Sequence, residues 1–177
     1  MTYKTLASRL VYENRWMRVR EDEIERADGT AGIYGVVEKV DFVVVLPIED
    51  GHVYLVSQYR YPLGRRCLEL PQGSWELEPD ADPTTVALGE LREETGLVAG
   101  RMERLGFADA ASGHATQGFH VFLATELTPG PSDVEPEEQD LEVHRLTLDE
   151  FVAGMREGRI TDAHTLAAYA LYQLRSR

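Results

Sequence analysis

The 177-residue sequence contains one cysteine, Cys67, and no long apolar run. A single cysteine excludes an intramolecular disulfide, and no set of histidine and cysteine residues has the spacing of a zinc site. No stretch approaches the roughly 20 apolar residues of a membrane-spanning helix, and the polar start lacks a segment of signal-peptide length. We therefore expect a soluble protein in the cytoplasm.

Positive charge is also scarce, because 18 lysine and arginine residues stand against 31 aspartate and glutamate residues. The resulting net charge of −13 argues against nucleic acid or an anionic membrane as partner, since both require a cationic surface. A protein this acidic binds phosphate groups through local arginines or bridging metal ions. A phosphate site is therefore expected where such residues gather.

The apolar pattern predicts strands, a helix, further strands and two final helices in one domain. Alternation around the Asp-Gly turn at 28–29 predicts antiparallel strands near the N-terminus. The runs 42–46 and 53–56 flank a second Asp-Gly turn at 50–51, and the first run is apolar on both faces, as in a central strand. This order favours a mixed α/β sandwich.

The first predicted helix has both of its ends marked. Asp82 is a typical N-cap, Pro83 suits the first helical position, and Gly96 suits the position just past the end. After this helix we expect, in order, strands at 101–113 and 118–127, a strand from 141, a short helix at 148–157 and a terminal helix capped by Asp162 or Thr161.

Three carboxylates, Glu90, Glu93 and Glu94, share one side of this helix because they are three or four residues apart. Each like-charged pair costs about 0.2 to 0.5 kcal/mol in an exposed helix. Clustered hard oxygens suit Mg²⁺ or Mn²⁺, and the Pro-Gly turn before the helix offers a backbone carbonyl near Gln72. The alternative is a solvated acidic face, which is common for a glutamate-rich helix.

The stretch 73–97 resembles the Nudix box, in which a glycine and an isolated glutamate precede Arg-Glu-hydrophobic-any-Glu-Glu-any-Gly-hydrophobic. Its second half, GELREETGL, matches at every position after the first. Gly89 replaces the expected arginine, and a spacing two residues longer leaves Ala81 where the isolated glutamate belongs, so Glu78 supplies that role or it is missing. A mid-helix glycine costs about 1 kcal/mol relative to alanine, so either a neighbour approaches closely or the position has drifted.

Beyond the box, QYRYPLGRRCLELPQG and VYENRWMRV resemble the ADP-ribose pyrophosphatase branch, and the likeness extends from about Val11 to the loop near Glu138. It implies an α/β (α+β) fold, the Nudix-type α/β/α sandwich with a mixed β-sheet, and an additional N-terminal antiparallel strand region. Residues 1–38 would be this strand region and form a homodimer, and residues 39–177 would be the Nudix hydrolase domain.

The same resemblance implies Mg²⁺-dependent hydrolysis, with Mn²⁺ as an alternative ion, of ADP-ribose or a related nucleoside diphosphate sugar. The products would be a nucleoside monophosphate and a sugar phosphate. The implied metal ligands are Glu90, Glu93, Glu94 and the Gln72 carbonyl. The implied catalytic residues are Glu138 or Glu137 as general base, together with Glu93. For the acidic loop that carries the first two, the alternative is a solvated charge run.

The candidates for substrate binding are Arg60, Arg66 and Glu69. Arg60 ends an expected buried strand beside the Pro-Gly turn, whereas surface solubility is the alternative for all arginines here, Arg65 included. Trp16 or Tyr34 would stack on a base, although an aromatic residue on a strand is more often part of a core. The small polar segment 112–118 is a further candidate for the pocket wall.

Two other functions stay open. Nudix relatives also hydrolyse nucleoside triphosphates, dinucleoside polyphosphates and capped RNA, and Gln72 stands where the ADP-ribose branch often has alanine. A noncatalytic nucleotide sensor is favoured by Gly89 and by the displaced glutamate. A sensor binds its ligand without turnover, which distinguishes it from an enzyme.

Overall fold

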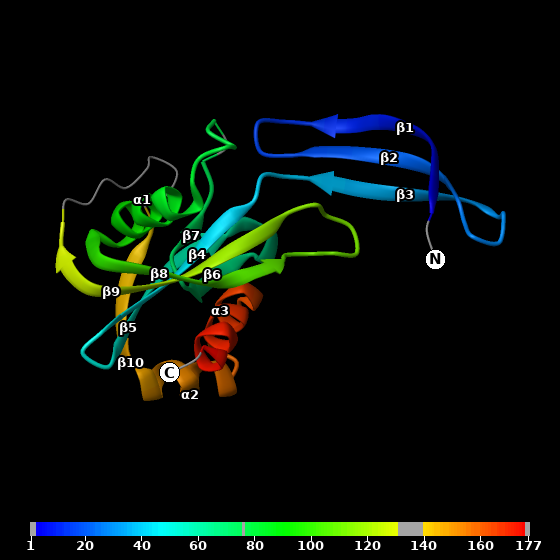
Figure 1. The fold of residues 1–177 in the computed structure, drawn as a ribbon. Helices are drawn as coiled ribbons and strands as arrows, with labels where there is room; N and C mark the ends of the chain where they lie inside the picture. The colour runs from blue at the N-terminus through cyan, green and yellow to red at the C-terminus, as the bar shows by residue number, and fades with distance from the viewer. Residues whose placement is uncertain (1–2, 76, 131–139, 176–177) are drawn as a thin grey trace.

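The computed structural model describes residues 3–75, 77–130 and 140–175, which form two sheets and three α-helices (Figure 1). In chain order the elements are β1 (Lys4–Glu13), β2 (Arg18–Glu25), β3 (Ala31–Glu38), β4 (Phe42–Glu49), β5 (His52–Arg60), the 3₁₀ turn η1 (Tyr61–Leu63), β6 (Arg65–Glu69), β7 (Gln72–Gly73), α1 (Pro83–Thr95), β8 (Leu97–Asp109), β9 (Gly118–Pro129), β10 (Glu142–Thr147), α2 (Leu148–Arg156) and α3 (Ala163–Leu174). The predicted mixed α/β fold is confirmed.

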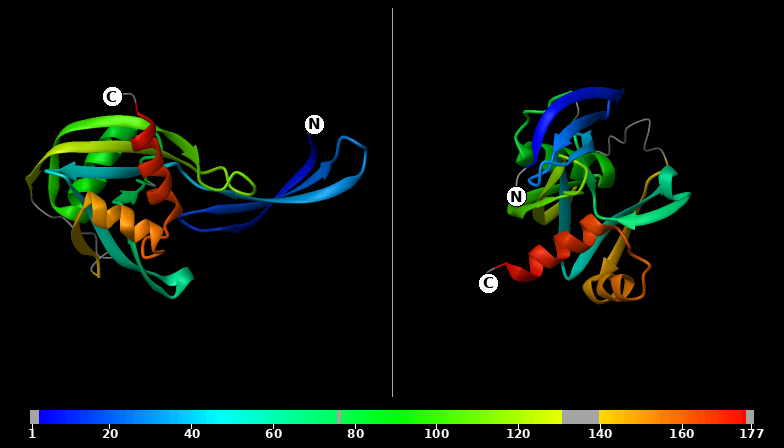
Figure 2. Two further views of the ribbon diagram at one scale, coloured as in Figure 1. Left: turned by 90° about the horizontal axis from the view of Figure 1, so that it is seen from below. Right: turned by 90° about the vertical axis from the view of Figure 1, so that its right-hand side faces the viewer.

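The first three strands form a sheet of their own. β2 lies between β1 and β3, and both pairings are antiparallel. This sheet extends away from the rest of the chain (Figure 2), and every residue of β1 is exposed. The apolar side chains of β1 therefore lack the cover that a second layer would provide.

The main sheet has the order β10-β5-β4-β9-β8, with β6 paired to β5 and β7 paired to β4. It is mixed, because β4 and β9 run parallel while their other neighbours are antiparallel. β4 is central and buried from Phe42 to Pro47, as its apolar run predicts. The predicted two-residue turn into β5 is also confirmed, since Asp50 and Gly51 have φ angles of 48° and 72°.

Helices cover both faces of this sheet: α1 lies on one side, and α2 and α3 lie on the other (Figure 1). Alternate residues of β4 point to opposite faces. Val43 and Val45 pack in the cluster beneath α1, whereas Val44 and Leu46 pack with Phe151 of α2 on the other face. The result is the expected α/β/α sandwich with two apolar layers.

The helix ends follow the predicted capping. The Asp82 carboxylate accepts hydrogen bonds from Thr84 N and Thr85 N, and Gly96 ends α1 in the left-handed region at φ 68°. Of the two caps expected for the last helix, Asp162 is the one observed. The ends of α1 are thus set by local chemistry, which fixes the register of its glutamates.

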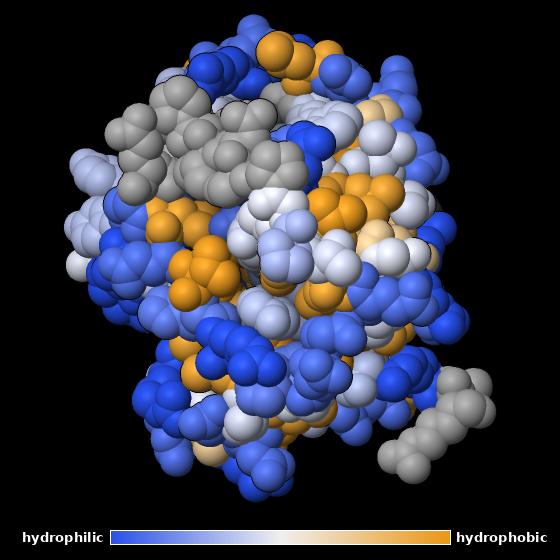
Figure 3. All heavy atoms as spheres, turned by 90° about the vertical axis from the view of Figure 1, so that its left-hand side faces the viewer, coloured by the Kyte–Doolittle hydropathy of each residue, from blue (hydrophilic) through white to orange (hydrophobic). Residues whose placement is uncertain are grey.

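The surface is largely hydrophilic. On the face shown in Figure 3, hydrophilic side chains predominate and apolar ones gather in small patches. Within the described ranges, no helix is long and apolar enough to cross a membrane.

Candidate functional site

Two of the three clustered glutamates of α1 are buried. The exposed fractions of Glu90 and Glu94 are 7% and 1%, whereas Glu93 is partly exposed and pairs with Arg92 at 3.4 Å. The alternative of a solvated acidic face is therefore wrong for Glu90 and Glu94. Burial of two carboxylates one turn apart is costly unless cations or hydrogen-bond donors compensate it.

The short strand β7 lies directly over these carboxylates. Gln72 N donates a hydrogen bond to Glu94 Oε2 at 3.1 Å. A Cβ atom placed on Gly73 would lie 2.6 Å from the Glu90 carboxyl carbon, so a larger residue there would require this carboxylate to move. Because β7 pairs with β4, the central strand fixes the height of this turn above α1.

Arg60 and Glu69 form a two-pronged ion pair at the end of the β5–β6 hairpin. Arg60 Nε lies 3.1 Å from both carboxylate oxygens, and Arg60 Nη2 lies 2.5 Å from Glu69 Oε2. Burial alone lowers the pKa of Arg60, but the hydrogen bonds and charge of Glu69 outweigh it and raise that pKa. The negative charges of Glu94 and Asp162 also raise the pKa of Arg60, so its guanidinium stays protonated among several carboxylates.

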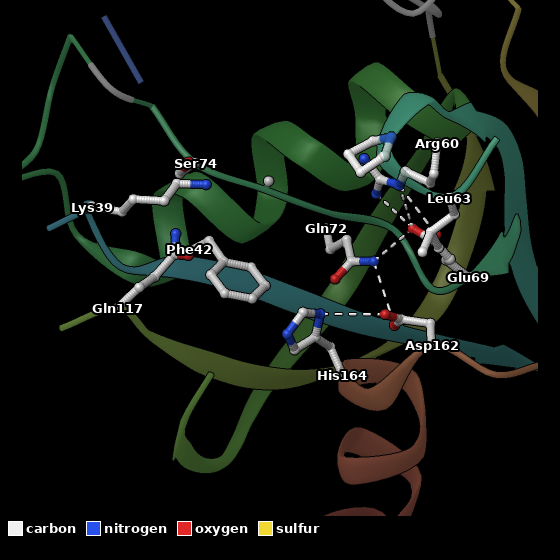
Figure 4. A pocket seen from close by; sticks show the side chains of 12 residues that line it. Lys39, Phe42, Arg60, Leu63, Glu69, Gln72, Ser74, Gln117, Asp162 and His164 are labelled. Carbon is white, nitrogen blue, oxygen red and sulfur yellow. Dashed lines mark hydrogen bonds and ion pairs between the residues drawn. The ribbon is translucent and has the colours of Figure 1, made fainter. Parts of the chain in front are cut away.

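Asp162, the N-cap of α3, joins the helix to the site (Figure 4). One carboxylate oxygen lies 3.3 Å from His164 Nδ1, and the other accepts hydrogen bonds from Thr165 and from Gln72 Nε2. Thr165 Oγ1 in turn accepts a hydrogen bond from Leu70 N, so α3 is tied to the segment that carries β7. Sequence reasoning recognised Asp162 only as a helix cap.

These contacts predict an acid dependence of stability. Burial raises the pKa of Asp162, but the hydrogen bonds from His164 and Thr165 outweigh it and lower the pKa from 3.8 to about 2. Because the folded pKa is depressed, the stabilisation is present above about pH 4 and is lost as the pH falls towards 2. It amounts to about 2 kcal/mol.

We therefore expect Asp162→Asn to make the acid-induced decrease in unfolding free energy between about pH 4 and 2 smaller by about 2 kcal/mol. Urea unfolding of the unmodified protein and of Asp162→Asn, measured between about pH 4 and 2 with a metal chelator present, gives the free energy of unfolding of each protein. Parallel curves for the two proteins would contradict the assignment.

Arg60, Glu69, Gln72 and Asp162 line a pocket of about 370 Å³, and Glu90 and Glu94 are not among its lining residues. Of the predicted residues it contains Arg60, Glu69 and Gln72, and Gln117 from the segment 112–118. Its walls also include residues that sequence reasoning missed, because they meet only through the fold: Lys39, Phe42, Pro62, Leu63, Asp162 and His164.

The side-chain amide of Gln72 faces this pocket, and its neighbours determine which of its two polar atoms is the donor. Nε2 donates to Glu69 at 2.8 Å, which leaves Oε1 as the acceptor. Oε1 is buried and has no hydrogen-bond partner among the described residues. A ligand hydroxyl or a cation would supply that missing interaction.

Other candidates lie outside the pocket. Arg66 binds Asp140 and the carbonyl of Ser57, at 3.0 and 2.7 Å. Arg65 bonds to Thr161 Oγ1, and Glu78 lines a separate small hollow beside Trp75. The two loop glutamates proposed as general base, Glu137 and Glu138, lie outside the described residues.

The two aromatic candidates for base stacking are not part of a core. Trp16 and Tyr34 remain 46% and 37% exposed, because both belong to the N-terminal region that has no second layer. Trp16 lines a further hollow that shares Lys39 with the main pocket. The expectation that they pack in a core is therefore wrong.

The chemistry of the donors fits a hard divalent cation. Mg²⁺ usually takes one or two carboxylates and a carbonyl, while waters and phosphate oxygens fill the remaining positions. Glu90, Glu94 and the turn at Gln72 provide such a set, and the buried carboxylates outnumber Arg60. In the part of the chain that the structure describes, no three His, Cys, Asp or Glu side chains are closed around one metal position.

Comparison with known proteins gives matches along almost the whole chain. A family model described as the nucleoside diphosphate sugar hydrolase N-terminal domain matches residues 3–37, and the NUDIX domain model matches residues 38–169. An ADP-ribose pyrophosphatase of Bacillus subtilis (strain 168) is 31% identical over 174 residues, covering 97% of this chain and 93% of that protein. A methanol dehydrogenase activator of Bacillus methanolicus is 31% identical over 173 residues, covering 97% and 92%.

A solved structure described as an ADP compounds hydrolase has the same fold. It superposes with a TM-score of 0.86 at 21% sequence identity, covering 98% of this chain and 93% of that one. The similarity therefore includes both the N-terminal sheet and the sandwich.

Proposed function

The chain belongs to the Nudix hydrolases and is a pyrophosphohydrolase, and from this premise we propose that it cleaves ADP-ribose or a related nucleoside diphosphate sugar. The products are a nucleoside monophosphate and a sugar phosphate. The ADP-ribose pyrophosphatase of Bacillus subtilis matches over the full length, N-terminal region included, which supports this substrate class.

One observation carries the proposal: Arg60 and the buried Glu69 share a pocket with the turn at Gln72 and Gly73, and this turn contacts the buried carboxylates Glu90 and Glu94. A diphosphate carries at least two negative charges. It therefore needs a metal cation between itself and the glutamates of α1, and a guanidinium group such as that of Arg60. Lys39, His164 and Gln72 Oε1 offer polar contacts for a sugar or base farther along the pocket.

Nudix hydrolases use a divalent metal ion, and we propose Mg²⁺ here, with Mn²⁺ as an alternative. Glu90, Glu94 and the Gln72 carbonyl would hold it, and Glu93 lies at the exposed edge of the same group. When bound, the ion neutralises phosphate charge and activates water. Arg60, held by Glu69, binds a phosphate oxygen and fixes the diphosphate for attack.

For the general base we retain Glu138, with Glu137 as the alternative. Arg66 of β6 bonds to Asp140, which follows Glu138 by two positions in the chain. We propose that Arg66 serves the site through its contact with Asp140 or by binding the substrate phosphates.

The cytoplasmic location stays a prediction.

A substrate panel tests the function. The purified protein is incubated with Mg²⁺ or Mn²⁺ and ADP-ribose, nucleotide sugars, dinucleoside polyphosphates, triphosphates or capped RNA, and products are separated by chromatography. We expect metal-dependent release of AMP and ribose phosphate from ADP-ribose. Turnover restricted to triphosphates or dinucleotides would show that the substrate belongs to one of these classes and is not a nucleoside diphosphate sugar. Tight binding without any turnover would identify a sensor.

We also propose that residues 1–38 form a homodimer and that residues 39–177 carry the hydrolase site. Leu6 and Leu10 of β1 are about half exposed, and Ile33 of β3 is 67% exposed. An isolated three-stranded sheet with uncovered apolar side chains is marginal in water, so a second copy is the natural cover.

Sedimentation analysis tests the dimer. We expect a dimer for the unmodified protein and a monomer for Leu6→Asp/Leu10→Asp, because charge on the apolar face opposes association. Leu174→Asp, at an exposed leucine near the other terminus, is the control and should remain dimeric. A monomeric unmodified protein would refute the proposal.

A further inference from the structure

The mid-helix glycine of α1 is matched by an aromatic ring. A Cβ atom placed on Gly89 would lie closer than 3.0 Å to Trp75 Cζ2 and 3.3 Å from two further ring atoms. Real Cβ atoms essentially never approach that closely, and an indole ring edge in a packed layer cannot yield cheaply. Even alanine is therefore too large at position 89 while Trp75 stays in place.

The ring is set firmly between the helix and the sheet. Trp75 packs against the apolar cluster that includes Val43, Val86 and Leu91. This cluster joins α1 to the central strand, so the ring touches both structures that position the site. Gly89 itself is buried, and its lack of a side chain forms the notch that the ring enters.

A second close contact runs in the opposite direction. Gly73, two residues before Trp75, lies against the carboxylate of Glu90, the residue next to Gly89. The turn thus inserts a ring where the helix has a glycine, and the helix inserts a carboxylate where the turn has a glycine. Together with the bond from Gln72 N to Glu94, these contacts set the distance between turn and helix.

We propose that Trp75 is a positioning residue that holds the Gln72 turn on the α1 carboxylates by packing into the Gly89 notch. In the Nudix pattern an arginine stands immediately before the first of these glutamates and orients the box by hydrogen bonding. Here the indole ring occupies the place above that position, so Gly89 is a requirement of the ring and not a drifted position. The inference rests on the proposed metal site and adds the residue that fixes its geometry.

Removal of the ring tests the positioning effect. We expect Trp75→Ala to weaken Mn²⁺ binding about 10- to 100-fold, the usual effect of losing a group that orients metal ligands. Trp75→Phe retains an aromatic ring in the notch and should stay within about threefold of the unmodified protein. Mn²⁺ affinity is measured by electron paramagnetic resonance titration, and thermal unfolding of the metal-free proteins reports separately on stability. Unchanged Mn²⁺ affinity in folded Trp75→Ala would overturn the proposal.

A paired substitution tests whether ring and arginine are alternatives for the same space. Gly89→Arg alone should unfold at a lower temperature and bind Mn²⁺ poorly, because the side chain meets the ring. Trp75→Ala/Gly89→Arg removes the obstacle and should bind Mn²⁺ more tightly than either single variant. Gly35→Ala, at a glycine of β3 with open space around it, is the control and should match the unmodified protein. A double variant that binds Mn²⁺ no more tightly than the better single variant would contradict the shared position.

These experiments distinguish failure of the proposed function from failure of the positioning role of Trp75. If the unmodified protein binds no Mn²⁺ and hydrolyses no diphosphate, the proposed function is wrong. If it does both and Trp75→Ala is unaffected, only the positioning role of Trp75 is wrong.

Discussion

Replacing Glu94 with glutamine is expected to reduce metal-dependent hydrolysis about a thousandfold, which corresponds to about 4 kcal/mol of transition-state stabilisation. Glu94 is the most buried glutamate of the site, and one of its oxygens accepts the Gln72 N–H. Glutamine preserves the shape and can still accept this hydrogen bond, but it removes the charge that a divalent cation requires. Steady-state product formation from ADP-ribose measures the loss.

Two controls accompany this measurement: a variant at an exposed glutamate and a test of folding. Glu103→Gln removes one negative charge from the exposed side of β8 and should leave the rate within about twofold. Thermal unfolding of metal-free Glu94→Gln should stay close to that of the unmodified protein, which would separate lost catalysis from lost structure. Near-normal hydrolysis by folded Glu94→Gln would remove Glu94 from the metal site.

Arg60→Met is expected to lower the free energy of unfolding by about 3 kcal/mol, near the low end for breaking a buried ion pair. Glu69 is 3% exposed, and the substitution leaves its charge with the Gln72 amide as the remaining described donor. The low end applies because Arg60 keeps 36% of its side chain exposed, so solvent screens part of the interaction. Urea unfolding at neutral pH measures the change.

Arg65→Met is the matched control, since Arg65 is exposed five residues away and bonds only to Thr161 and a backbone carbonyl among the described residues. Its effect should stay within about 0.5 kcal/mol. In the Arg60→Met/Glu69→Gln variant, the buried charge is gone, so the double substitution should cost less than the sum of the single ones. Additive effects would show that the pair is not coupled.

The local elements followed from the sequence because their signals act over a few residues. Asp82, Pro83 and Gly96 mark the ends of α1 by chemistry within one turn, and the Asp-Gly pair at 50–51 sets a two-residue hairpin. The apolar run 42–46 identified the central strand for the same reason: burial on both faces leaves no polar positions.

The composition of the pocket depended on contacts between distant segments. Asp162 reaches Gln72 across 90 positions of the chain, and Leu70 N bonds to Thr165 across 95. No local pattern indicates such pairs, since the three-dimensional path of the sheet decides which residues meet. His164 and Phe42 came into the pocket in the same way.

The caps, the strand pattern and the register of the carboxylates on α1 follow from the sequence, because each depends on near neighbours in the chain. The family resemblance follows from the sequence as well. The folded chain was needed to show which carboxylates are buried, that Arg60 pairs with Glu69, and why position 89 is glycine. Burial and close approach are properties of packing between elements. The ring of Trp75 fits against Gly89 because turn and helix are held together by the central strand, which no local signal encodes.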